Sequence, residues 1–96
     1  MSETRLGFVG VVVQDRRRAE DVNHILSQYG GIIRGRIGVP DPSSGAGVIG
    51  LIVEGSNDQV GAMTGRLGNL SGVTVKSALT AKKEAPASGG QKEESI

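Results

Sequence analysis

The sequence lacks cysteine, and among its 96 residues only Phe8 and Tyr29 are aromatic. The absence of thiols excludes disulfide bonds, thiolate metal sites, iron–sulfur ligation and a cysteine nucleophile within this chain. No apolar run approaches the length of a membrane span, and the first residues do not have the apolar core of a signal peptide. We therefore expect a cytoplasmic protein that does not contact a membrane.

An excess of charge of one sign is also lacking. Eleven lysines and arginines balance ten acidic residues, for a net charge of +1, which gives no general attraction to nucleic acid or anionic lipid. The sole histidine, His24, is expected on the polar side of a helix, and the carboxylates form no paired set on an apolar cleft. The sequence therefore predicts no catalytic residues, no metal site and no cofactor, and we expect the protein not to be an enzyme.

Glycine is abundant, with sixteen residues. A short chain with a small aliphatic core is marginally stable alone, and oligomerisation is a common remedy. Residues 80–96 combine lysine and glutamate with alanine, proline, serine and glycine, a composition that cannot offset its ordering entropy by burial. We expect one domain over residues 3–79, followed by a disordered charged tail over residues 80–96.

Two predicted strands, residues 6–13 and 48–53, are apolar on both faces. Such a run is typical of a strand that is covered on both sides, whereas a half-exposed strand alternates apolar and polar residues. The predicted strands at residues 32–39 and 73–79 do alternate, and in the former we expect Arg34 and Arg36 on the face turned away from the helices. The two doubly apolar strands should be central and the two alternating strands should be at the edges.

Two helices are predicted between these strands. The first follows Asp15, a plausible N-cap, and the second follows Ser56, which forms a capping-box pattern with Gln59. Apolar residues recur at helical spacing in both. The order β-α-β-β-α-β predicts an α+β, ferredoxin-like fold: a four-stranded antiparallel sheet with two helices on one face. Because two helices cover only one face, we expect a second copy of the chain on the other.

A stripe of glycines runs along the second predicted helix at Gly61, Gly65 and Gly68. Each costs about 1 kcal/mol relative to alanine in a helix interior. One explanation is an interface or a ligand that presses against the helix, since small residues allow close approach. The alternative is that a neighbouring segment of the same chain crosses there.

Basic residues occur in two places that could meet a ligand. Arg16, Arg17 and Arg18 lie at the start of the first helix, where an anion near Asp15 is one explanation and pairing with Glu20, Asp21 or a neighbour is the other. Arg34 and Arg36 on one edge strand, with Lys76 as their counterpart on the other, could rim an interface or bind an acidic ligand. The alternative, which we prefer, is ordinary charge protection of a sheet edge.

Residues 35–40 (GRIGVP) and 61–78 (GAMTGRLGNLSGVTVKSA) resemble the regulators of the iron-only hydrogenase system. The resemblance covers residues 4–79 and implies an ACT-like ferredoxin fold, similar to the ligand-binding domain of nickel-responsive repressors. It also implies a homo-oligomer, a dimer or a tetramer, linked to hydrogenase maturation or control. No ribbon-helix-helix module precedes the first strand, and the repressors' pattern of nickel ligands is not matched, so we expect neither direct nucleic-acid binding nor nickel sensing.

Two hypotheses for function follow. The first is an oligomeric regulatory domain that binds a small-molecule effector; its candidate ligand contacts are Asp15, Arg16, Arg17, Arg34 and Arg36, and its candidate interface residues are Gly61, Gly65, Gly68 and Lys76. The second is an adaptor without a small ligand, which docks on a hydrogenase maturation protein or a separate transcription factor through residues 40–47 and the tail.

Overall fold

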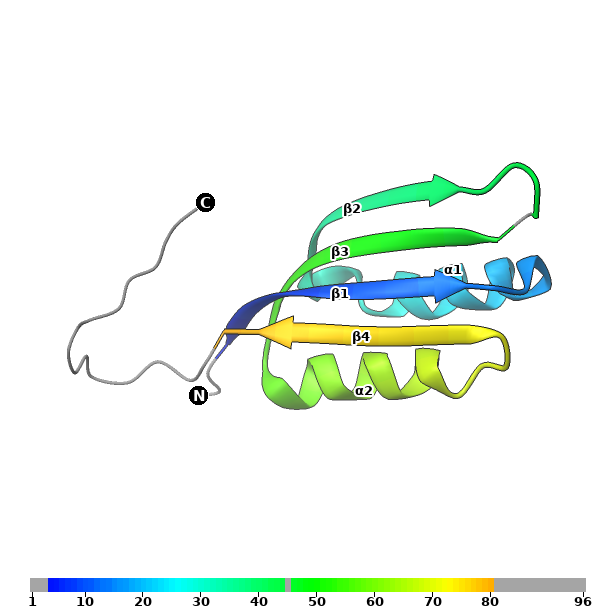
Figure 1. Cartoon of the computed structure of the whole chain (residues 1–96). Coiled ribbons are helices and arrows are strands. Elements are labelled where there is room, and N and C mark those ends of the chain that lie inside the picture. The colour runs from blue at the N-terminus through cyan, green and yellow to red at the C-terminus, as the bar shows by residue number, and fades with distance from the viewer. Residues whose placement is uncertain (1–3, 45, 81–96) are drawn as a thin grey trace.

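The computed structural model describes residues 4–44 and 46–80. Its elements are β1 (Arg5–Val13), α1 (Ala19–Gln28), β2 (Ile33–Pro40), β3 (Gly47–Gly55), α2 (Asn57–Gly68) and β4 (Val73–Leu79), with short 3-10 turns η1 (Arg16–Arg18) and η2 (Gly30–Ile32) on either side of α1. The strands form one antiparallel sheet in the order β2-β3-β1-β4 (Figure 1). This confirms the predicted ferredoxin-like topology. The predicted tail lies outside the described residues, apart from Thr80.

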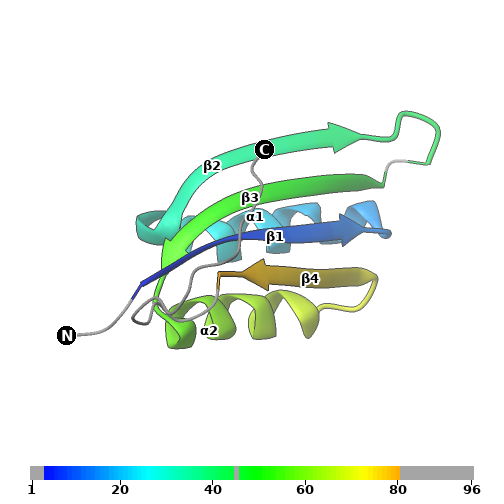
Figure 2. The same ribbon diagram turned by 60° about the vertical axis from the view of Figure 1, so that its left-hand side comes forward.

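Both helices pack on the same face of the sheet (Figures 1 and 2). Alternate residues of β1 and β3 point toward them, and burial of each such side chain contributes about 1.5–3 kcal/mol. The buried core comprises Val9, Val11, Val13, Val22, Ile25, Leu26, Ile32, Leu51, Val53, Val60, Met63, Leu67 and Val73. The opposite face, which we call the open face, has no helix over it within the described residues.

The helix starts follow the sequence signals closely. Ser56 Oγ accepts a hydrogen bond from the Gln59 backbone N–H at 3.0 Å, and Gln59 Oε1 accepts one from the Ser56 backbone N–H at 2.9 Å, so the predicted capping box is present. Asp15 is also an N-cap, but of η1, and α1 proper begins only at Ala19. The three arginines therefore occupy a 3-10 turn ahead of the helix.

The orientation of β2 differs from the prediction. Ile33 pairs with Val53 and Gly35 pairs with Ile52, so the register slips by one residue at a β-bulge. Beyond a one-residue slip every side chain changes face. Arg36 pairs with the core residue Leu51 and therefore lies on the helix side.

The expectation that Arg34 and Arg36 share the open face is thus wrong for Arg36. The apolar residues Ile37 and Val39 take the open face instead, where their exposed fractions are 69% and 62%.

Candidate functional site

The open face of the sheet is strongly apolar. Its large exposed apolar side chains are Leu6, Phe8, Val12, Ile37, Val39, Val48 and Ile52, from three neighbouring strands. Single exposed apolar residues are common on protein surfaces, but a contiguous patch marks an interaction surface. The sequence predicted an apolar surface here because two strands are apolar on both faces. The bulge in β2 enlarges this surface, since it adds Ile37 and Val39.

Two glycines, which have no side chain, lie in the middle of the open face. Gly10 and Gly50 lie opposite each other on β1 and β3. A Cβ atom added at Gly50 would lie 3.1 Å from Phe8 Cε1, and one at Gly10 would lie 3.2 Å from Phe8 Cε2. The Phe8 ring therefore lies across both glycines, an arrangement that shields glycine backbone within a sheet. Toward the end of β4 the face carries a shallow hollow lined by Leu6, Phe8, Ile52, Ala78, Leu79 and neighbouring residues.

Charged groups lie at the margins of the open face. Arg34 Nε donates to Glu54 Oε1 at 3.1 Å, and both side chains are about half exposed. Lys76 lies opposite Gly10 in the register, on the edge strand β4. Arg34 and Lys76 therefore both lie at the edges of the open face. Their part in an interface stays a prediction.

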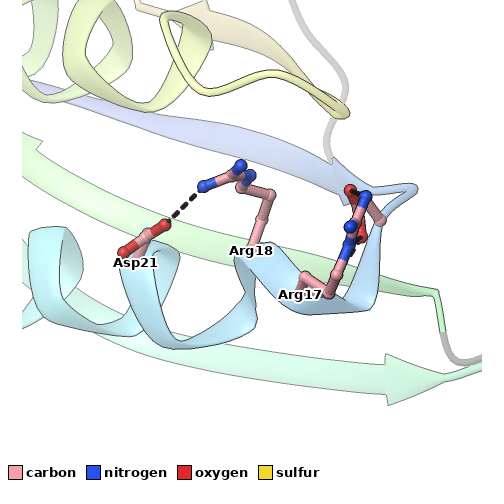
Figure 3. A network of polar contacts seen from close by, with 4 residues as sticks. Arg17, Arg18 and Asp21 are labelled. Atoms are coloured by element: carbon pink, nitrogen blue, oxygen red, sulfur yellow. Dashed lines mark hydrogen bonds and ion pairs between the residues drawn. The ribbon is translucent and has the colours of Figure 1, made fainter.

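The second candidate region is the turn after β1 (Figure 3). Arg17 donates from Nε to Asp15 Oδ1 at 3.0 Å and from Nη2 to Asp15 Oδ2 at 2.9 Å, and its backbone N–H also reaches Oδ1 at 3.0 Å. These hydrogen bonds, led by those from the guanidinium, lower the pKa of Asp15 to about 2. Arg18 Nη1 pairs with Asp21 at 2.9 Å. Arg17 and Arg18 thus already have carboxylate partners, which agrees with the pairing explanation, while Arg16 is exposed.

A pocket of about 230 Å³ lies between α1 and the β2–β3 hairpin, on the helix side of the sheet. We call it the α1 pocket; it is lined by Val13, Ala19, Val22, Asn23, Gly38, Pro40, Ala46, Gly47 and Ile49. Arg36 Nη2 donates a hydrogen bond of 2.5 Å to Asn23 Oδ1, which brings the guanidinium to the lining. Sequence reasoning missed this pocket because it placed Arg36 on the other face of the sheet.

The glycine stripe of α2 faces open space. A Cβ atom added at Gly61, Gly65 or Gly68 would meet nothing within 4 Å in the described part of the chain. No described segment therefore crosses there, so the local-packing alternative fails for residues 4–44 and 46–80. An interface at the stripe stays a prediction.

His24 is exposed on α1, as predicted. Residues 4–44 and 46–80 contain no group of three or more histidines and acidic residues placed to hold a metal ion. Neither helix of this part of the chain combines the length and the apolar character needed to cross a membrane.

Comparisons with known proteins agree with the resemblance. The TM1266-like family, described as "Iron-only hydrogenase system regulator, putative", matches residues 5–77. The solved structure of TM1266 from Thermotoga maritima, an uncharacterized protein, is similar with a TM-score of 0.76 and 35% identity, over 82% of this chain and 100% of that chain.

A structure of CPII, a nitrogen regulatory PII-like protein from Thiomonas intermedia K12 bound to ADP, AMP and bicarbonate, has a TM-score of 0.47 and 16% identity, over 83% of this chain and 96% of that chain. No curated protein matches the sequence. The family match spans three quarters of the chain, and the chain therefore belongs to the TM1266-like family of iron-only hydrogenase system regulators.

Proposed function

We propose that this chain is a regulatory domain of the iron-only hydrogenase system that works as a homo-oligomer, in which a second copy covers the open face. The proposal is carried by one observation: seven large apolar side chains are exposed together on the face that the helices leave free. It is supported by the family to which the chain belongs.

The size of the open face suits a stable contact. Strands lie about 4.8 Å apart and rise about 3.3 Å per residue, so four strands of this length give a flat footprint on the order of 500 Å². Side-chain relief adds to that area, and a standard interface buries about 800 Å² on each partner. Apolar surface contributes about 25 cal/mol per Å² removed from water, so covering this face offers a large driving force.

The distribution of charge favours a second copy as the occupant. In a two-fold contact the same patch meets itself, so charges near its middle would repel. Here the middle consists of Phe8, Gly10 and Gly50, and Lys76 and the Arg34–Glu54 pair lie at the margins. Two copies can therefore approach without like charges at the centre.

Assembly offers a route to regulation without catalysis. A small effector that binds one assembly state more tightly than another shifts the equilibrium between them by its difference in affinity. The oligomeric state of the domain would then change with the effector concentration. A partner in the hydrogenase system would bind one oligomeric state and not the other.

The test is the mass of the full chain by native mass spectrometry and light scattering. We expect the wild type at a multiple of 9.9 kDa. Ile52→Lys, which places a charge on the open face opposite Phe8, should leave a folded monomer. Ala62→Lys, an apolar-to-lysine change at an exposed position of α2, is the matched control and should keep the wild-type mass. A multimer of unchanged mass in Ile52→Lys would overturn this assembly.

The adaptor hypothesis uses the same surface with a different occupant, a hydrogenase maturation protein or a separate transcription factor. The observation that favours it is the exposed apolar surface of the open face, whereas the position of the charges favours a second copy. It expects a wild-type monomer of 9.9 kDa that co-purifies with one defined partner, and loss of that partner in Ile52→Lys but not in Ala62→Lys.

A further inference from the structure

We infer that the α1 pocket binds a small monocarboxylate with an apolar body, and that Arg36 receives the carboxylate. The pocket lies on the helix side of the sheet and is separate from the open face. The role of such a ligand as the effector rests on the proposed function, whereas its binding does not depend on assembly.

The pocket exists because β2 has no side chain at one helix-side position. Gly38 lies opposite Ile49 in the register, and a Cβ atom added there would meet nothing within 4 Å. The space is therefore unfilled, and Gly38 is not needed for a close approach of backbone or for a left-handed conformation.

The walls of the α1 pocket are suited to an apolar body. Val13, Val22 and Ile49 supply branched aliphatic side chains from a strand, a helix and a second strand, and Pro40 closes the hairpin side. Its volume of about 230 Å³ exceeds that of the engineered apolar cavity of about 150 Å³ that accepts benzene in another protein. A ligand with a short aliphatic chain or one aromatic ring would fit.

The rim of the pocket supplies one positive charge. Arg36 lies two residues before Gly38 on the same side of β2, and Asn23 of the lining accepts one of its five N–H donors. Among the described residues Arg36 has no carboxylate partner, in contrast to Arg17, Arg18 and Arg34. Guanidinium binds carboxylate with two parallel hydrogen bonds, so a head group with one negative charge is the match.

The probe is hexanoate, titrated into the full chain and followed by calorimetry and by amide chemical shifts. Hexanamide keeps the shape without the charge, and hexyl phosphate carries a second charge that no described group of the lining neutralises. We expect hexanoate to bind and to shift the amides of α1 and β2, while the other two bind at least about tenfold more weakly, since a hydrogen bond to a charged group is worth that much. Equal binding of hexanamide, or tighter binding of hexyl phosphate, would overturn the assignment.

Two variants locate the site. Gly38→Leu fills the pocket and should abolish binding with the circular dichroism spectrum unchanged, and Arg36→Gln should weaken it at least about tenfold. The matched control is Arg34→Gln. It removes a guanidinium from the same strand, but one that pairs with Glu54 and not with Asn23 of the pocket, so this variant should bind hexanoate as the wild type does. Retained binding in Gly38→Leu would contradict the inference. Ile52→Lys should still bind hexanoate, so a failure of assembly and a failure of this pocket are told apart.

Discussion

Asp15 is the residue at which several local contacts converge. It caps η1, holds Arg17, and lies against the turn that precedes β4, where Gln14 N–H donates to Gly72 O at 2.7 Å. Gly72 has φ of +77°, and a Cβ atom there would lie 2.7 Å from Asp15 Cβ, so only glycine fits without strain. The carboxylate therefore organises the point where β1 leaves the sheet.

The lowered pKa of Asp15 predicts an acid dependence of stability. The folded state binds the proton less tightly than the unfolded state, because the Arg17 guanidinium and backbone N–H favour the carboxylate. The stabilising contribution is thus complete above the ordinary value of 3.8 and is lost as pH falls through about 2.

Asp15→Asn keeps a capping oxygen for the Arg17 N–H but removes the charge. We expect the variant to melt below the wild type at neutral pH, and the two melting temperatures to converge as pH falls to about 2. Thermal unfolding followed by circular dichroism measures this. A difference that stays constant over the whole range would show that the ion pair with Arg17 contributes nothing.

At the scale of elements, β2 shows both the reach and the limit of sequence reasoning. Alternation over residues 32–39 predicted an edge strand, and the structure places β2 at the edge. The same alternation could not reveal the bulge between Ile33 and Gly35, because a bulge depends on pairing with β3 and not on residue type. One extra residue moved Arg36 to the helix side and Ile37 to the open face, so the α1 pocket could not be foreseen.

The helices were more predictable because their signals are local. The Ser56–Gln59 capping box and the stripe of Val60, Met63 and Leu67 appear in the sequence and in the structure alike. The glycine stripe was visible too, but the sequence could not say whether the chain itself fills the space beside it.

The glycine stripe leads to a prediction for α2. Gly65 lies inside the helix with open space around it, so Gly65→Ala should raise the free energy of unfolding of the isolated chain by about 1 kcal/mol through helix propensity. Denaturant titration measures the change. Gly61→Ala, on the same stripe, is a second test and should also raise the free energy of unfolding.

A larger side chain tests the predicted interface at the stripe. If a partner backbone approaches the stripe, Gly65→Leu should reduce the mass of the oligomer while the helix content is retained. An unchanged mass by light scattering would remove Gly61, Gly65 and Gly68 from the interface and leave the open face as the surface of assembly.

At the scale of the whole molecule, one layer of helices covers one side of the sheet (Figure 2). The central strands of that sheet are apolar on both sides. The sheet therefore exposes on its other side an apolar surface that resembles a protein core in composition. The family to which the chain belongs is described as "Iron-only hydrogenase system regulator, putative". Coverage of the apolar surface by a second copy is the central claim of the proposed function.

The measurement that tests this claim most directly is the solvent exposure of the isoleucine methyl groups of the full chain in solution. In a chain labelled at isoleucine methyls, a soluble paramagnetic agent broadens exposed groups and spares covered ones. Ile37 and Ile52 are 69% and 46% exposed on the single chain, whereas Ile25 is 6% exposed and serves as the internal standard. We predict that Ile37 and Ile52 are spared nearly as well as Ile25 in the wild type. In Ile52→Lys, where the open face should be uncovered, we predict that Ile37 is broadened and Ile25 is still spared. Broadening of both methyl groups in the wild type, at a concentration where the chain is multimeric, would show that the open face is not the surface that a second copy covers.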